Sequence, residues 1–309
     1  MRQIILDVDT GIDDALGIIL AVKSGIADIV GITTVSGNIS IQTATTNTCK
    51  ILELIHAKEI PVIQGAVHPV IREPRYEHDV HGVDGLGGAL KDMTPSIEPR
   101  DGFAPDFIIR TVKENPGVIT LIMTGPLTNL ALALRKCAEL PKLVDEVVFM
   151  GGALSVSGNI TPTAEFNMFA DPEAARIVFQ AGFKKLTMVG LDVTSKVLFK
   201  DDHIAQLTNP VIKDYVAASL NDYMDRHARV YDSIRASLLH DPLAVGVALY
   251  SGLVTTKAYH VDIETTSRLC DGQTVCDFHN SWGKSPNMNV CIEVDSEAFL
   301  KLFIDTLNK

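Results

Sequence analysis

The stretch IILDVDTGIDDALGIILAVKS, residues 4–24, decides the fold. Its first part, Ile4–Val8, is a nearly continuous apolar run, which is typical of a strand buried on both faces of a parallel sheet. The spacing of apolar residues from Asp13 to Ser24 predicts a helix, and Gly11 permits a tight turn before it. A buried strand followed by a turn and a helix is the building unit of α/β folds.

Short runs rich in Val and Ile recur between helical patterns along the first two thirds of the chain. Further strands are expected at Ile29–Val35, Pro61–Gln64, Ile119–Thr124, Glu146–Met150 and Leu186–Val189. Further helices are expected at Gln42–His56, Ala104–Glu114, Leu127–Cys137 and Pro172–Ala181. This alternation predicts an α/β fold with a mostly parallel, doubly wound central sheet flanked by helices.

The last third of the chain has a different pattern. We expect a mostly helical segment, two late strands and a closing helix, at Asp201–Leu239, Tyr259–Thr266, Met288–Val294 and Ser296–Leu307. Since no Pro/Gly/Ser-rich linker, repeat or low-complexity tract interrupts the chain, one domain over residues 1–309 is favoured. The segment Val67–Pro105 lacks both periodicities, and a loop of that length in a compact domain is usually functional.

Composition limits the classes of partner and the compartment. The net charge of −11, without any block of basic residues, argues against a nucleic-acid surface and favours a small-molecule substrate. The start of the chain has no apolar stretch with a cleavage site, and no apolar run is long enough to span a membrane. Five cysteines without a C-x-x-C pair suit reduced thiols. We therefore expect a soluble cytoplasmic protein.

Four aspartates, Asp7, Asp9, Asp13 and Asp14, gather at the carboxyl end of the first strand. Ligands of open α/β sheets bind at this end of the strands. Because four carboxylates repel one another, either their pKa values rise or a cation binds among them. Oxygen ligands favour Ca²⁺ or Mg²⁺. The alternative is that Asp13 only caps the helix while Asp7 and Asp9 are solvated, but a cap needs one aspartate.

Other segments carry candidate polar residues, each with a structural alternative. They are Asn38 after the second strand, His81 in the glycine-rich HGVDGLGG, the turn TGPLTN from Thr124, GNITPTAEFN from Gly158 to Asn167, and His240-Asp241-Pro242. The alternatives are an incidental loop histidine, ordinary turns, and Asp241 as a helix cap. Tyr223, His227 and Tyr231 share one helix face, a pattern more often due to core packing than to a pocket.

Together these motifs resemble the inosine–uridine preferring nucleoside hydrolase family from Ile4 to about Leu249, in the order that the family has. The resemblance implies hydrolysis of the N-glycosidic bond between ribose and a nucleobase. It also implies Ca²⁺ held by Asp9, Asp14, Asp241 and the backbone carbonyl of Thr124, with Asp7 behind the site and Asp13 as the general base. The family further suggests a dimer or tetramer.

The resemblance also assigns the substrate-binding residues. Asn38, Asn159, Glu165 and Asn167 would hold the ribose, and Met150 would line the pocket. His81 and His240 match positions near the leaving base, and His240 is the candidate acid because an imidazole can titrate near neutral pH. Tyr223, His227 and Tyr231 correspond only loosely to the helix that contacts the base. Histidines at these two positions resemble those of the less selective and of the pyrimidine-preferring branches of the family. The preferred nucleobase therefore stays open.

Two other classes of protein stay open at this point. A phosphatase of the haloacid dehalogenase type also begins with a strand ending in D-x-D and uses Mg²⁺, but it leaves Asn159–Asn167 and His240-Asp241 without a role. A nucleoside- or calcium-binding protein that has lost catalysis is the second, although the aspartates that catalysis needs are intact. Release of free ribose from a nucleoside distinguishes both from a hydrolase.

Overall fold

The computed structural model describes residues 1–230 and 234–309, and an eight-stranded sheet forms its centre. In spatial order the strands are β3 (Val62–Gln64), β2 (Ala27–Thr34), β1 (Arg2–Val8), β4 (Ile119–Met123), β5 (Glu146–Met150), β6 (Leu186–Val189), β12 (Met288–Val294) and β9 (Val254–Tyr259). All neighbouring strands are parallel except β12 and β9. The predicted fold class, a mostly parallel sheet flanked by helices, is confirmed.

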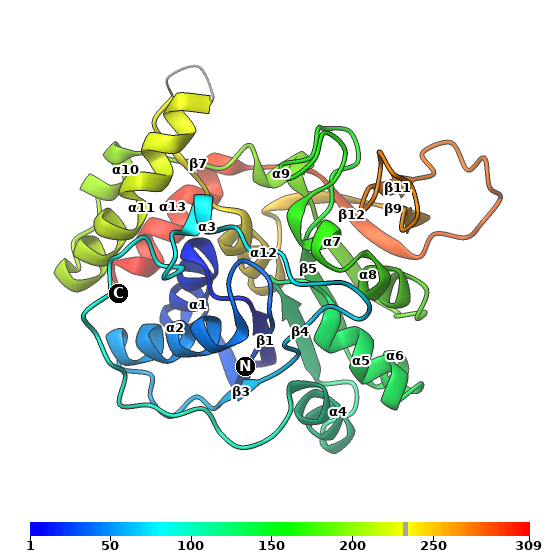
Figure 1. Cartoon of the computed structure of the whole chain (residues 1–309), viewed down its shortest axis with the longest axis horizontal. Helices are drawn as coiled ribbons and strands as arrows, with labels where there is room; N and C mark the ends of the chain where they lie inside the picture. Colours follow the sequence, from blue (N-terminus) through cyan, green and yellow to red (C-terminus); the bar gives the residue numbers. More distant parts are fainter. Residues whose placement is uncertain (231–233) are drawn as a thin grey trace.

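Helices cover both faces of this sheet (Figure 1). They are α1 (Ile12–Ser24), α2 (Ile41–Leu54), α3 (His78–His81), α4 (Ala104–Glu114), α5 (Thr128–Lys136), α6 (Leu140–Leu143), α7 (Phe166–Ala170), α8 (Pro172–Phe179), α9 (Leu191–Thr194), α10 (Asp201–Ala205), α11 (Pro210–Val230), α12 (His240–Leu249) and α13 (Ser296–Leu307). Two short antiparallel pairs complete the fold, β7 (Leu198–Phe199) with β8 (Ser237–Leu238) and β10 (Val261–Ile263) with β11 (Thr274–Cys276).

The core lies in two layers because successive strand residues point to opposite faces. In β1, Ile4 and Leu6 pack with α1, α12 and α13, whereas Ile5 packs with α4, α5 and α8. All three side chains are fully buried, so the apolar run at the start of the chain serves both layers. This explains why the strand has no alternation of apolar and polar residues.

The strand order places β1 at the switch point of the sheet. Its two neighbours are β2 and β4, so the chain winds outward from β1 in one direction and then, starting at β4, in the other. Ligands of doubly wound sheets bind in the crevice at the carboxyl ends of such strands. The aspartates that follow β1 therefore lie where this fold has its binding crevice.

The first and the twelfth helix pack closely beside this crevice. A Cβ atom on Gly17 of α1 would lie 3.3 Å from Cγ2 of Val245 and 3.6 Å from the carbonyl carbon of Asp241, both on α12. The absence of a side chain at residue 17 thus lets the two helices approach. As a result the N-terminal ends of α1 and α12 lie together, although they are far apart in the sequence.

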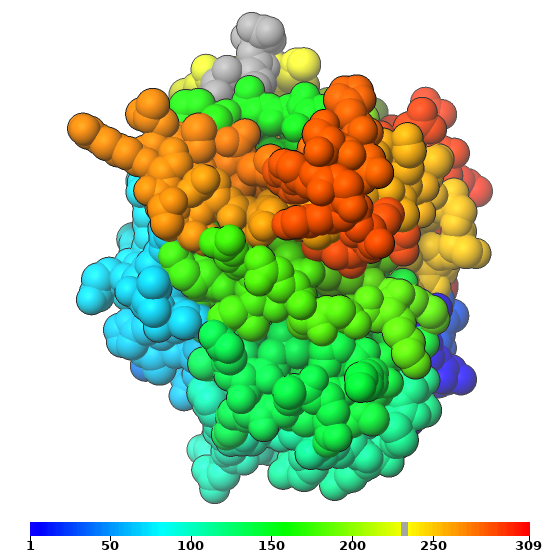
Figure 2. All heavy atoms as spheres, turned by 90° about the vertical axis from the view of Figure 1, so that its right-hand side faces the viewer, coloured from blue at the N-terminus to red at the C-terminus, as the bar shows by residue number. Residues whose placement is uncertain are grey.

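Elements in the last third differ most from the prediction. The strand predicted at Tyr259–Thr266 is confirmed only at its centre: β10 lies within it at Val261–Ile263, whereas Tyr259 belongs to the end of β9. The missed part of β9, from Val254, is an edge strand whose central residues are exposed, so it has no buried apolar run. In Figure 1 the segment carrying β10 and β11 extends beyond β12, and Figure 2 shows it (orange) over the green part of the surface.

Candidate active site

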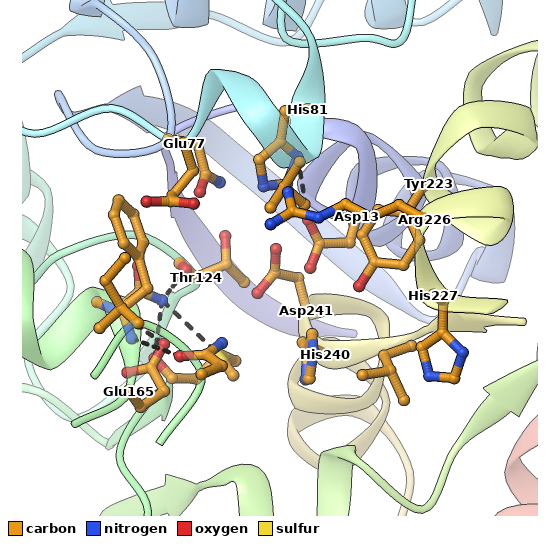
Figure 3. A pocket seen from close by; sticks show the side chains of 18 residues that line it. Asp13, Glu77, His81, Thr124, Glu165, Tyr223, Arg226, His227, His240 and Asp241 are labelled. Carbon is orange, nitrogen blue, oxygen red and sulfur yellow. Dashed lines mark hydrogen bonds and ion pairs between the residues drawn. The ribbon is translucent and has the colours of Figure 1, made fainter. Parts of the chain in front are cut away.

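A cavity of about 240 Å³ opens at the carboxyl end of the sheet (Figure 3). Most of the site residues expected from the sequence line it, namely Asp13, Asn38, His81, Thr124, Met150, Asn159, Glu165, Asn167, Tyr223, His227, His240 and Asp241. Asp7, Asp9 and Asp14 lie beneath it and are buried. Tyr231 lies outside the described residues. The structure thus brings together segments from β1, the long loop, and the middle and last thirds of the chain.

The start of α1 shows which aspartate serves the helix. The backbone N–H of Gly11 donates to Oδ2 of Asp14 over 2.9 Å, and Ile12 is the first helical residue. Asp14 therefore holds the first turn of the helix. Asp13 does not cap the helix, and its side chain points into the cavity (Figure 3). The interpretation of Asp13 as a simple helix cap does not agree with this geometry.

Asp7 lies behind the cavity, where two polar side chains donate hydrogen bonds to it. Its Oδ2 accepts hydrogen bonds from Oγ1 of Thr33 over 2.5 Å and from Nδ2 of Asn129 over 2.7 Å. Burial nevertheless raises the pKa of Asp7 to about 7, because the two hydrogen bonds only partly offset the loss of water. Asn129 also donates to the carbonyl of Thr34 and accepts from the N–H of Ala66, so one amide joins the ends of several strands.

Three carboxylates converge at the floor of the cavity. Oxygen atoms of Asp13, Asp14 and Asp241 all lie within 4.8 Å of one another, and the three residues are buried. Burial, followed by repulsion from neighbouring aspartates, raises the pKa values of Asp13 and Asp241 above the usual range. Such a group could hold a metal ion, and its all-oxygen donors suit a hard cation.

Buried carboxylate oxygens without hydrogen-bond partners indicate that a cation fits among these aspartates. Oδ1 of Asp9 and Oδ1 of Asp13 are buried and have no hydrogen-bond partner. Buried carboxylate oxygens without partners are costly, and a bound cation would remove that cost. Asp9 itself is held by the backbone N–H of Asn38, which donates to its Oδ2 over 2.6 Å. Gly37 must lack a side chain, since a Cβ there would lie 2.1 Å from the same oxygen.

Thr124 and two asparagines organise the carboxylates. Oγ1 of Thr124 donates to Oδ1 of Asp14 over 2.6 Å, and Nδ2 of Asn38 donates to its Oδ2 over 3.2 Å. The carbonyl of Thr124 accepts from Nδ2 of Asn167 over 2.6 Å, and its second lone pair stays available to a cation. Asn167 also donates to the carbonyl of Met150. These contacts fix one wall of the cavity.

Glu165 and Asn159 are held by the backbone of the same wall. The Glu165 carboxylate caps α7, accepting from the N–H groups of Asn167 over 2.9 Å and Met168 over 3.2 Å, and it also accepts from Gly152 over 2.9 Å. Burial raises the pKa of Glu165 in spite of these bonds. Oδ1 of Asn159 accepts from the N–H of Phe166 over 3.0 Å. The amide hydrogens of Asn159 therefore remain to meet a ligand.

Both histidines near the aspartates are buried. Burial lowers the pKa of His81 to about 3 and that of His240 to about 4, so both imidazoles are neutral near pH 7. Nδ1 of His240 lies 2.7 Å from Oγ1 of Thr194. The expectation that His240 titrates near neutral pH does not agree with this environment. His227 is held by its Nδ1, which lies 2.8 Å from the carbonyl of Ile234.

Several lining residues were missed by the sequence reasoning. The cavity is also lined by Glu77, Val80, Ile160, Phe166, Arg226 and Leu238. A signal for Arg226 did exist: it follows Tyr223 by three residues on α11, a spacing that places both on one helix face. Glu77 precedes a helix of a single turn inside the long loop, and no periodicity marks such a position.

An acidic cavity at the switch point of a doubly wound sheet is where this class of fold binds a small molecule. The chain belongs to the inosine–uridine preferring nucleoside hydrolase family, whose model matches residues 4–301. It is therefore a nucleosidase, which hydrolyses the N-glycosidic bond of nucleosides. This membership sets aside the phosphatase alternative. None of the described helices is long and apolar enough to cross a membrane.

Individual relatives agree with the family over almost the whole chain. A pyrimidine-specific ribonucleoside hydrolase RihA of Salmonella arizonae is 39% identical, covering 98% of this chain and 97% of its own length. A solved plant nucleoside hydrolase is 34% identical, covers 99% of each chain and superposes with a TM-score of 0.92. A purine-preferring ribonucleoside hydrolase from Gardnerella vaginalis is 31% identical, covers 99% of this chain and 98% of its own, and has a TM-score of 0.91.

Proposed function

We propose that the chain hydrolyses ribonucleosides to ribose and free base with Ca²⁺ as its metal and Asp13 as its general base. The convergence of the Asp13, Asp14 and Asp241 oxygens within 4.8 Å, on the floor of the cavity, carries this proposal. The unpartnered Oδ1 of Asp9 supports it, because a cation would satisfy that buried oxygen. Ca²⁺ accepts six to eight oxygen ligands and tolerates the irregular geometry that side chains from distant segments provide.

The ligands proposed for Ca²⁺ are Asp9, Asp14, Asp241 and the carbonyl of Thr124. When bound, the cation supplies positive charge that keeps these carboxylates ionised and favours the loss of a proton from a nearby water molecule. Asp7 supports the arrangement from behind, since its hydrogen bonds tie the end of β1 to its neighbours. We assign Asp13 a different role because its side chain lines the cavity that the substrate would occupy, whereas Asp9 and Asp14 do not line it.

Asp13 acts as the base in the bond-breaking step. Its carboxylate takes a proton from water, the water oxygen forms a bond to the anomeric carbon, and the carbon–nitrogen bond breaks with its electron pair going to the base. A single attack from the face opposite the base inverts the configuration at that carbon.

The walls of the cavity orient the sugar for this step. Asn38, Asn159, Glu165 and Asn167 offer amides and a carboxylate to the ribose hydroxyls, and Met150 packs against the ring. We assign His81, His240, Tyr223 and His227, which also line the cavity, to the surroundings of the base. Holding the reactants in one geometry removes much of the entropic part of the barrier. The relatives named above include pyrimidine-specific and purine-preferring enzymes, so the favoured base must be measured.

Release of ribose from uridine and inosine tests the proposal. The enzyme is assayed as purified, after treatment with a calcium chelator, and after Ca²⁺ or Mg²⁺ is added back. We expect chelation to abolish ribose release and Ca²⁺ to restore it. Full activity after chelation, with no metal detected by elemental analysis, would overturn the metal assignment. Absence of ribose release from all four common ribonucleosides in the calcium-loaded enzyme would overturn the function.

A further inference from the structure

Arg226 is the only Lys or Arg among the described residues that line the cavity. Its side chain leaves α11 and reaches over the cavity toward Asp13 and His81 (Figure 3). Its Nη1 atom is buried and has no hydrogen-bond partner. Buried donors are nearly always paired in folded proteins, so an unpaired guanidinium nitrogen above a binding cavity calls for an explanation.

The neighbours of Arg226 do not supply that partner. The adjacent Asp225 is engaged elsewhere, since its Oδ1 accepts from Nε of Arg235 over 2.7 Å. Glu77, across the cavity, is close enough for the positive charge of Arg226 to lower its pKa, although burial raises it more. The guanidinium thus has an unused donor on a side chain that lines the cavity, and its charge does not depend on pH.

The position of Arg226 in the cavity indicates which part of the substrate it would contact. Figure 3 shows Glu165 and Thr124 at one end of the cavity, Tyr223, Arg226 and His227 at the other, and Asp13 and Asp241 between them. In the proposed function, the ribose occupies the end with the amides and Glu165. The nucleobase then meets the end formed by α11, where Arg226 projects.

We propose that Arg226 contacts the nucleobase and stabilises the negative charge that it acquires as the glycosidic bond breaks. This inference rests on the proposed function and adds a catalytic residue to it. When the bond breaks, its electron pair moves onto the ring nitrogen and is shared with the carbonyl oxygens of bases such as uracil or hypoxanthine. The guanidinium donates to such an oxygen, and the departing base then takes a proton from solvent, while Asp13 returns to solvent the proton it took from water.

The expected size of the effect follows from comparable sites. A fixed donor aimed at charge that develops in the transition state changes kcat by about 10²–10³-fold when it is removed. The effect depends on the leaving group. A leaving group that is already stable as an anion, such as 4-nitrophenolate, needs little help from a cation, so its departure should be almost independent of Arg226.

The experiment compares Arg226→Met, Arg226→Lys and Arg229→Met in the calcium-loaded enzyme. Arg229 is the matched control because it lies on the same helix, is exposed and does not line the cavity. Each variant is assayed with uridine, inosine and 4-nitrophenyl β-D-ribofuranoside. We expect R226M to lower kcat with uridine and inosine by about 10²–10³-fold and with the nitrophenyl riboside by less than about threefold. We expect the kcat of R226K with the nucleosides to be at least about tenfold higher than that of R226M, because lysine restores the positive charge.

Other outcomes are equally informative. Equal losses on nucleosides and on the nitrophenyl riboside would mean a structural role and would overturn the proposal, as would unchanged nucleoside hydrolysis by R226M. A lysine variant no better than methionine would overturn the role of charge. Thermal melting and calcium binding of each variant show whether the fold and the metal site persist. A wild-type enzyme that hydrolyses neither kind of substrate would instead refute the proposed function itself.

Discussion

Nδ1 of His81 accepts a hydrogen bond of 3.1 Å from the backbone N–H of Ile12. The contact joins the long loop to the first turn of α1, next to the aspartates. Because Nδ1 uses its lone pair as an acceptor, the ring proton must be on Nε2 and the imidazole is neutral. Burial lowers the pKa of His81 to about 3 and keeps the ring in this state. His81 thus connects two segments beside the cavity, the long loop and the start of α1, through a buried hydrogen bond.

We expect His81→Ala to destabilise the protein. It leaves the buried N–H of Ile12 without its acceptor, and such a loss costs about 1–3 kcal/mol in the free energy of unfolding. Urea denaturation measures this. His78→Ala is the matched control, since His78 is on the same short helix but exposed, and we expect a change below about 0.5 kcal/mol. Equal effects of the two changes would contradict the role given to the contact.

Asp13→Ala should remove catalysis and leave the fold intact. Loss of a general base lowers the rate by about 10²–10⁴-fold, while the hydrogen bonds that hold Asp9 and Asp14 are unaffected. Ribose release measures turnover, and calorimetric titration with Ca²⁺ measures whether the metal still binds. Asp28→Ala, an exposed change on β2, serves as the control. An Asp13→Ala enzyme within tenfold of the wild type would exclude Asp13 as the base.

The calcium-free protein should lose stability as the pH rises from 6.5 to 8. Burial raises the pKa of Asp7 to about 7, and burial and repulsion raise the pKa values of Asp9 and Asp241 well above normal. In this range the folded state retains protons that the unfolded state has already lost, so each increase in pH favours unfolding. The buried histidines act in the opposite direction, because their pKa values are lowered on folding, but this contribution is nearly complete above about pH 7, where they are neutral in both states.

Thermal melting in a chelator and in Ca²⁺, at several pH values, measures this effect. Bound Ca²⁺ favours the ionised carboxylates, so the melting temperature of the loaded protein should vary less, and the difference between the two curves should widen with pH. A chelated protein whose melting temperature increases from pH 6.5 to 8 would show that these carboxylates are ionised in the folded state without the metal.

Asn129→Leu should be among the most destabilising changes outside the cavity. The amide donates to Asp7 and to the carbonyl of Thr34, and it accepts from Ala66, so leucine removes three buried hydrogen bonds, of which only the one to Asp7 has a second donor, Thr33. We expect a loss of about 3 kcal/mol or more in urea denaturation. The exposed Asn221→Leu on α11 is the comparison. A loss below about 1 kcal/mol at residue 129 would mean that water replaces the amide.

The fold could be predicted where the signal is local. The predicted bounds of β5, β6, α4, β12 and α13 coincide with those in the structure, because a buried run or an amphipathic pattern marks each of them. The edge strand β9 was missed because its exposed Thr255, Thr256 and Lys257 lack such a run. Its position depends on pairing with β12, which is information from elsewhere in the chain.

The site could be predicted in part. The aspartates after β1 stand out because repulsion among four carboxylates requires an explanation, and the resemblance to a family identified most other lining residues. Glu77 has no sequence signal of its own, and Arg226 has only its spacing from Tyr223, so the folding of the long loop and α11 over the cavity is what brings both residues to it. The neutral state of His240 likewise follows from burial, which a sequence does not display.

The close approach of α1 and α12 at Gly17 has a consequence for biosynthesis. A ribosome releases Asp9, Asp13 and Asp14 at the very beginning of translation, but Asp241 emerges only near the end. Until α12 packs against α1, Asp9 and Asp14 lack Asp241, the third carboxylate of the proposed metal site. Under the proposed function, a nascent chain therefore has a complete metal site only after α12 has been made and has packed against α1.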